Sequence, residues 1–297
     1  MSKKTREDEL KEVKVLGVKI NPLSKKDFLK KIVYFLKDNN QHYVVTTNPE
    51  FLMTAMHDNE FKRILNLSDL SLADGSGVIW ADYFMNLPVE VSGEFSPAKR
   101  SVYRKRKIRN QAVFSLLVNL FYPKKTRVNI PERLSGADLI FSICELLAKN
   151  DHSLYLLGGQ GKTPVSAKFE LERQFPDLLI SGIKGGFSKE KILDEELVEA
   201  VNKAKPDVVF VALGHPFQEK WIFRNLDKMP SVKLAIGVGG ALDFIGGSRR
   251  RAPLWLRKIN LEWLFRLIQE PNRLNRIKTA VWEFPRTVCQ EKIKISG

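Results

Sequence analysis

The sequence predicts an α/β protein, and three features support this class. Short apolar runs rich in β-branched residues recur along the chain, as is typical of buried parallel strands. Segments with helical spacing of apolar residues separate these runs. Glycine or polar residues directly follow several runs, and ligands of open α/β sheets bind at the carboxyl ends of strands. We therefore expect a Rossmann-like, mostly parallel sheet flanked by helices, with a functional site at one edge.

The predicted elements alternate along the chain. The strands are expected at 13–20, 42–48, 70–73, the start of 153–169, 178–186, 207–214 and 233–240. The helices are expected at 24–38, 50–56, 59–66, 77–86, a segment ending near 150, and 189–204, with further helices after residue 249. Ser24 is a suitable N-cap for the first of these helices.

Composition narrows the class of protein. The 297 residues, of which 43% are hydrophobic, can bury one large α/β core or two modest ones. No window reaches the roughly 18 continuous apolar residues of a membrane span, and the charged N-terminus lacks the apolar core of a secretory signal. Cys144 and Cys289 do not form a disulfide framework, and the four histidines show no metal-binding spacing. These features favour a cytoplasmic protein without a metal site.

The net charge of +15 is unevenly distributed. Residues 99–127 hold ten Lys and Arg and no acid, and residues 249–297 hold twelve Lys and Arg against four acids. The rest of the chain is slightly acidic, so we expect an α/β catalytic domain over 1–248 and a helical basic appendage over 249–297. Basic segments bind nucleic acid or anionic lipid.

Residues 89–130 interrupt the α/β alternation. A largely apolar run over 111–122 lies between basic stretches and is too short to cross a bilayer. Such a run suits a helix lying among lipid headgroups, and the alternative is an amphipathic helix packed on the core. Residues 99–127 could also form a basic arm, which is typical of a nucleic-acid-binding α/β protein. The apolar run that interrupts these basic residues is better suited to contact with lipid.

Asp74 and Gly75 follow the 70–73 strand and open a helix directly. A carboxylate at that position, next to a glycine that allows a ligand to approach the backbone, is a candidate catalytic group. Asp-Gly is also a common turn. Thr46 and Asn48 end the preceding strand, where they can bind a sugar or a phosphate, although Asn48 can equally cap the next helix.

Two glycine-containing segments invite nucleotide-binding interpretations. Gly158 and Gly159 begin a P-loop-like sequence, but a P-loop requires glycine at position 156, which is leucine. A glycine turn facing a diphosphate remains compatible. Leu242 likewise breaks a dinucleotide fingerprint after the 233–240 strand, which disfavours an oxidoreductase. The residues that follow the 207–214 strand are further candidates for substrate binding: Gly214, Gln218, Glu219 and Lys220.

Five segments, in order, resemble the WecG/TagA/CpsF glycosyltransferases, glycosyltransferase family 26. They are TTNPE (46–50), LADGSGVIWA (72–81), PERLSGADL (131–139), LGHPFQEKW (213–221) and GVGGALDFIGGSRRRAPLWL with LEWLFRLIQEP (237–271). The resemblance implies transfer of an N-acetylmannosamine-type or related sugar from a UDP-sugar to a polyprenyl-diphosphate-linked saccharide. It also implies a peripheral location on the inner face of the cell membrane, in contact with anionic lipid.

The resemblance assigns roles by motif. Asp74 matches the general base, and the residues matching polar groups of the active site are Thr46, Asn48, Arg133 and Gln218. Asp243 lies in a segment associated with the nucleotide, and 249–297 matches a membrane-docking appendage. Relative to the family, 89–130 is an insertion. It contains an imitation of the Arg133 motif at 90–93 that lacks the arginine, so Arg133 is given the role.

The expected mechanism is an inverting transfer without metal or cofactor. Asp74 would take the proton of the acceptor hydroxyl, and Arg133 with backbone N–H groups near Gly158 and Gly159 would stabilise the departing UDP. The sequence contains no Asp-x-Asp pair of the kind that holds a divalent ion in many sugar-nucleotide enzymes. A homo-oligomer is compatible with these features, and no nucleic-acid partner is expected.

Overall fold

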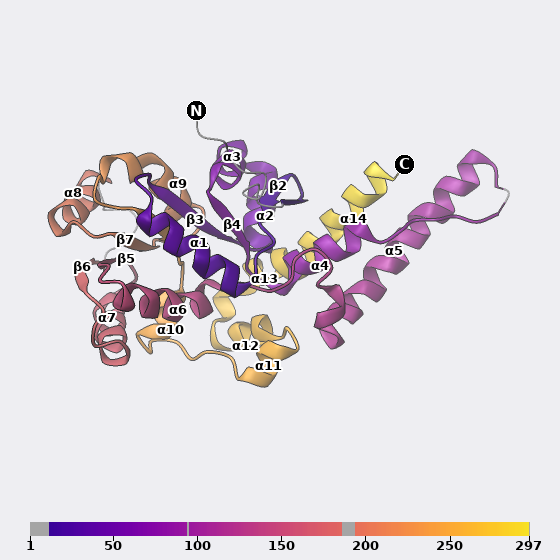
Figure 1. Cartoon of the computed structure of the whole chain (residues 1–297). Helices are drawn as coiled ribbons and strands as arrows, with labels where there is room; N and C mark the ends of the chain where they lie inside the picture. The colour runs from indigo at the N-terminus through magenta and orange to yellow at the C-terminus, as the bar shows by residue number, and fades with distance from the viewer. Residues whose placement is uncertain (1–11, 94, 186–193, 297) are drawn as a thin grey trace, which may run out of the picture.

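A six-stranded parallel sheet forms the centre of the computed structural model, which describes residues 12–93, 95–185 and 194–296 (Figure 1). The strand order is β4-β3-β8-β7-β5-β6, and each adjacent pair is parallel. The strands are β3 (His42–Thr47), β4 (Leu70–Ala73), β5 (Leu154–Gly158), β6 (Ile180–Lys184), β7 (Val208–Ala212) and β8 (Leu234–Gly237). The predicted fold class is therefore confirmed.

The first predicted strand is wrong in one respect. Residues 13–20 form a hairpin of two short antiparallel strands, β1 (Val13–Val15) and β2 (Val18–Ile20). Leu16 and Gly17 between them have φ of 50° and 76°. Positive φ at both central residues is the signature of a tight two-residue hairpin turn. The apolar alternation that predicted one strand continues through this turn, which explains the error.

Helices cover both faces of the sheet. They are α1 (Lys25–Lys37), α2 (Pro49–His57), α3 (Asn59–Leu67), α4 (Ser76–Asn86), α6 (Gly136–Lys149), α7 (Thr163–Gln174), α8 (Asp194–Ala204), α9 (Phe217–Asn225) and α10 (Ala241–Ile245). Ser24 caps α1 as predicted, because its hydroxyl accepts from the Asp27 N–H at 3.2 Å. Residues 189–193, the expected start of α8, lie outside the described residues.

Two apolar clusters form the core, one on each face of the sheet. Val45, Val209 and Val211 face a cluster that includes α2, α3, α4, α8 and α9. Val44 and Phe210, adjacent to these residues in sequence, face the other cluster with α1, α6, α7 and α10. Alternate strand residues point to opposite faces, so continuous apolar strands pack helices on both sides.

The segment 89–130 forms one long helix, α5 (Pro97–Phe121), followed by the 3-10 turn η1 (Pro123–Thr126). The helix projects from the body of the molecule beside α14 (Figure 1). Ile108 and Ala112 pack into the core, whereas Phe114 and Phe121 are 67% and 65% exposed. Among the described residues, no helix combines the length and the apolar character that a membrane span requires.

The C-terminal segment returns to the body. It comprises α11 (Leu254–Lys258), α12 (Glu262–Gln269), η4 (Pro271–Arg273), α13 (Leu274–Lys278), the π-helical turn η5 (Thr279–Glu283) and α14 (Phe284–Ile295). Phe284 is fully buried, with its ring 6.3 Å from that of Trp80. Lys292 is 2% exposed, and its ammonium donates to the carbonyls of Phe84 and Leu87 at the end of α4. Helix α14 is thus tied to the core of the α/β body.

We predict that Phe284→Ala lowers the free energy of unfolding by about 3–5 kcal/mol, because it leaves a cavity beneath α14. The matched control is Trp282→Ala, two residues earlier and 67% exposed, which we expect to change it by less than about 0.5 kcal/mol. Urea unfolding followed by circular dichroism measures both values. Equal effects of the two substitutions would contradict the packing of α14 on the core.

Candidate active site

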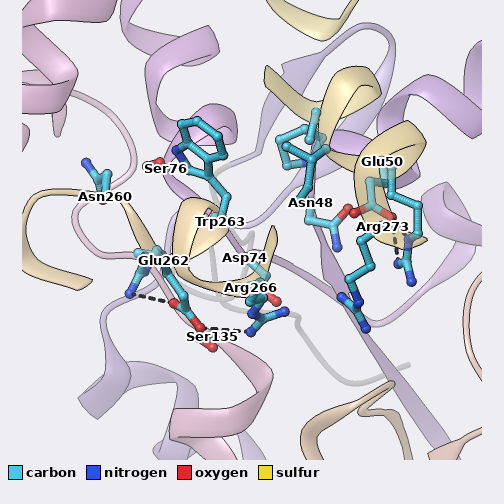
Figure 2. A pocket seen from close by; sticks show the side chains of 16 residues that line it. Asn48, Glu50, Asp74, Ser76, Ser135, Asn260, Glu262, Trp263, Arg266 and Arg273 are labelled. Carbon is cyan, nitrogen blue, oxygen red and sulfur yellow. Dashed lines mark hydrogen bonds and ion pairs between the residues drawn. The ribbon is translucent and has the colours of Figure 1, made fainter. Parts of the chain in front are cut away.

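Asp74 stands at the carboxyl end of β4, where the strand turns into α4. Its N–H donates to the Thr47 carbonyl at 2.8 Å, which continues the β3–β4 ladder by one residue. Gly75 then takes a φ of 103°, a conformation that favours glycine, and α4 begins at Ser76. This turn presents the Asp74 carboxylate to a cleft above the sheet edge (Figure 2).

The cleft consists of two adjoining cavities that meet at Asp74. Both are lined by Asn48, Asp74, Ser135, Arg266, Arg273 and Arg276. The first cavity adds Glu50, Gly75, Ser76, Arg133, Glu262 and Trp263 among others. The second adds Thr46, Gly214, His215, Gln218, Gly239, Phe244 and Arg249 among others. One wall comes from the loops at the carboxyl ends of the strands, and the other comes from the C-terminal segment.

The environment of Asp74 makes its carboxylate a stronger base than one in water. Burial raises the pKa of Asp74 to about 6, although the Arg133 and Arg266 guanidiniums pull it down. The negative charges of Glu262 and Asp138 raise the pKa of Asp74 further. A carboxyl group with this pKa is mostly ionised at pH 7 and still accepts a proton readily.

Glu262 contacts the two guanidiniums that lower the pKa of Asp74. Its carboxylate accepts from Arg266 at 2.8 Å, as Figure 2 shows, and lies 3.9 Å from Arg133. The Arg266 guanidinium also stacks 4.9 Å from the centre of the Phe244 ring. These contacts fix the cations in place before any substrate arrives.

A second group of arginines borders the cleft. Arg276 donates to Glu50 at 2.6 Å, and Arg273 donates to Glu270 at 2.6 Å. Burial lowers the pKa of Arg273, and the neighbouring Arg276 and Arg266 cations add to this effect. Crowded, partly buried guanidiniums are stabilised by an anion, and they match phosphate oxygens in geometry. The cleft is therefore suited to a phosphorylated ligand beside Asp74.

Most of the polar residues predicted for the site do meet in the cleft. Thr46, Asn48, Arg133, Gly214 and Gln218 all line it together with Asp74 and Gly75. The capping interpretation of Asn48 is also correct, because its Oδ1 accepts from the Phe51 N–H at 3.1 Å. Asp243 does not line either cavity; it pairs at 3.0 Å with Arg249, which lines the second cavity, and burial raises the pKa of Asp243.

Gln218 joins two loops of the cleft. Its Oε1 accepts from the N–H groups of Gly214 and Gly239, each at 3.1 Å, and the residue is 1% exposed. Its Nε2 donates to Glu219 at 2.6 Å. Gln218 therefore positions the loops after β7 and β8. Glu219 lies fully buried behind Gly237 rather than at the cavity wall, and burial raises its pKa to about 7.

Besides Asp243 and Glu219, three further predicted substrate contacts are not brought into the cleft. Lys220 forms ion pairs with Asp58 at 2.7 Å and with Glu60 at 2.8 Å, away from the cavities. The Gly159 N–H donates to Ala212 O at 3.0 Å and so is not free for a phosphate. A Cβ on Gly158 would lie 2.5 Å from the same carbonyl, so this glycine permits the close approach of β5 and β7. Both glycines therefore have a structural role at the end of β5, beside β7.

Sequence reasoning missed the contribution of the C-terminal segment, which was assigned to membrane docking alone. Arg249, Glu262, Trp263, Arg266, Arg273 and Arg276 all line the cleft and come from this segment. The available signal was the Glu262–Arg266 pair at helical i, i+4 spacing within an otherwise apolar helix. Glu50 and His215 lie inside motifs that were recognised but were given no role. In the described part of the chain, no group of three or more His, Cys, Asp or Glu side chains is arranged to hold a metal ion.

Comparison with known proteins identifies the family of this chain. Two proteins of Staphylococcus aureus, from strains MRSA252 and MW2, are 25% and 24% identical over 285 residues, which cover 95% of this chain and 94% of each relative. Both are named N-acetylglucosaminyldiphosphoundecaprenol N-acetyl-beta-D-mannosaminyltransferase. The model of the WecG/TagA/CpsF glycosyl transferase family matches residues 13–116 and 118–296, a range that includes most of 89–130. The chain belongs to this family and is a glycosyltransferase.

Proposed function

We propose that the protein transfers an N-acetylmannosaminyl residue from a UDP-sugar to a polyprenyl-diphosphate-linked N-acetylglucosamine, with inversion at the anomeric carbon and without a metal ion. The names of the Staphylococcus aureus relatives support the transferred sugar and the acceptor class. The observation that carries the mechanism is the Asp74 carboxylate, placed between two cavities and surrounded by arginines.

Asp74 acts as the general base in this proposal. A sugar hydroxyl is a poor nucleophile at neutral pH, and a carboxylate within hydrogen-bond reach can take its proton as the new bond forms. The acceptor oxygen bonds to the anomeric carbon, the bond from that carbon to the UDP oxygen breaks, and the proton moves to Asp74. Attack from the side opposite to UDP inverts the configuration.

The arginines supply the positive charge that the departing UDP needs. Arg266, Arg273 and Arg276 line both cavities, so they can contact a diphosphate that lies beside Asp74. We place the nucleotide in the second cavity, next to Gly214 and Asp243, and the acceptor sugar in the first. The absence of an Asp-x-Asp pair from the sequence is consistent with stabilisation by guanidinium groups.

We predict that Asp74→Asn lowers the transfer rate by about 10²–10⁴-fold, because the amide cannot accept the proton, and retains UDP binding. Transfer of labelled sugar and isothermal titration with UDP measure the two quantities. The matched control is Asp69→Asn, at the amino end of the same strand, which should leave the rate nearly unchanged. Equal rates for wild type and Asp74→Asn would refute the assignment.

The same transfer assay tests the metal-free part of the proposal. Wild-type protein should retain its rate in the presence of a chelator. Activity that disappears with chelator and returns only with a divalent ion would show that the arginines do not suffice.

We also propose that the protein works at the cytoplasmic face of the membrane, held there by α5 and by the basic C-terminal segment. Phe114, Leu117, Phe121 and Tyr122 expose apolar side chains on α5 and directly after it, close to a run of lysines and arginines. Apolar side chains with neighbouring cations are the combination that binds an anionic membrane surface, at about 1 kcal/mol per Lys or Arg.

We predict that Phe114→Ala/Phe121→Ala weakens binding to anionic vesicles by about tenfold or more, because two exposed rings no longer enter the bilayer. Phe169→Ala, 70% exposed on α7, is the control and should bind as wild type does. Vesicle flotation measures the retention. Retention on DNA rather than on vesicles at matched salt would favour the nucleic-acid alternative for 99–127.

A further inference from the structure

A third cavity lies between the end of α5 with η1 and the helix α11. It shares Ser76, Arg133 and Asn260 with the first cavity of the cleft, so it leads toward Asp74. Its lining is strongly basic. The cations are Lys124, Arg127, Arg133, Arg257 and Lys258, and they face a single carboxylate, that of Glu132. Glu132 already accepts from the Lys25 N–H at 2.8 Å.

Hydrogen bonds between buried groups define one wall of this basic cavity. Asn119, at the end of α5, accepts from the Thr126 hydroxyl at 3.0 Å through its side chain and from Asn260 Nδ2 at 2.9 Å through its carbonyl. Its own Nδ2 donates to the Ser76 carbonyl at 3.4 Å. Thr126 is fully buried. The end of α5, the start of α4 and the turn before α12 are thereby joined, which holds Lys124 of η1 at the cavity.

The Arg257 guanidinium of the basic cavity is incompletely hydrogen-bonded within the described part of the chain. Arg257 approaches Asp138 at 3.5 Å, and its Nε is buried without a hydrogen-bond partner among the described residues. A buried donor without a partner is costly, and an anionic ligand would satisfy it. Several cations facing one engaged carboxylate favour a ligand with more than one negative charge, as a diphosphate has.

Exposed apolar side chains lie on the far side of the basic cavity. Leu254 lines the cavity and is 64% exposed, and Trp255 beside it is 63% exposed. Phe121 and Tyr122 are exposed immediately before η1. Moving outward from Asp74, a ligand therefore meets the first cavity, the basic cavity and then an apolar rim. A sugar joined through a diphosphate to a lipid has the same order of chemical groups.

We infer that the basic cavity binds the diphosphate of the lipid-linked acceptor. Its sugar then reaches Asp74 past Arg133, and its lipid leaves over Leu254 and the end of α5. This inference rests on the proposed function. It assigns the diphosphate of the donor and the diphosphate of the acceptor to different binding sites. The UDP diphosphate binds the arginines of the cleft, and the acceptor diphosphate binds Lys124, Arg127 and their neighbours.

The test uses farnesyl diphosphate, a soluble lipid diphosphate, and UDP as separate probes in isothermal titration. Lys124→Ala/Arg127→Ala removes two cations of the cavity, both exposed and outside the catalytic cleft. We expect the affinity for farnesyl diphosphate to fall by about tenfold or more, because two charge-assisted hydrogen bonds are lost. The affinity for UDP should change by less than about twofold. The acceptor KM should rise by a similar factor at unchanged donor KM.

The charge-matched control is Lys105→Ala/Lys125→Ala. Lys105 lies on α5 outside the cavity, and Lys125 lies in η1 but stacks on Tyr122 instead of lining the cavity. The inference is overturned if wild type does not bind farnesyl diphosphate, if the control pair loses as much affinity, or if UDP binding falls equally. Competition by farnesol but not by inorganic pyrophosphate would also overturn it. These binding measurements do not require sugar transfer by the wild-type protein. A failure of the proposed function can therefore be told apart from a failure of this inference.

Discussion

The packing of α14 against α4 determines the architecture of the active site. Phe284 fills a space beside Trp80, and Lys292 satisfies carbonyl groups at the end of α4. These contacts return the C-terminal segment to the sheet edge that carries Asp74. This return, together with ion pairs such as Arg276–Glu50, holds α12 and α13, with Arg266 among their residues, over the cleft. The sheet by itself supplies one wall of the cleft, and the C-terminal segment supplies the other.

Opposing electrostatic effects then tune the site. Burial raises the pKa of Asp74, and nearby guanidiniums limit that rise, so the carboxylate remains ionised near neutral pH. Carboxylates such as Glu262 and Glu50 hold the guanidiniums in position. Charges fixed in this way need little reorganisation when negative charge develops on a leaving group. The proposed sugar-transfer mechanism thus depends on ion pairs among residues that line the cleft.

The sequence allowed the sheet, most helices and half of the site to be predicted, because these follow local rules. Apolar runs identified the strands, and polar residues at strand ends, such as Thr46 and Asp74, met at one edge as parallel topology requires. Gly158 was misassigned because a glycine needed for close strand packing looks, in sequence, like one that faces a phosphate. Lys220 pairs with Asp58, 162 positions away. Such long-range placement, like that of Arg273, depends on tertiary packing that no local pattern reveals.

The most direct test of this account is the pH dependence of kcat/KM for sugar transfer, measured on wild type and Arg266→Met. We expect the wild-type value to fall about tenfold per pH unit below an apparent pKa of about 6, because protonated Asp74 cannot accept the hydroxyl proton. In Arg266→Met the inflection should move to higher pH, because a cation that stabilises the carboxylate is lost. A profile without an inflection in this range, or one that Arg266→Met leaves in place, would contradict the central claim.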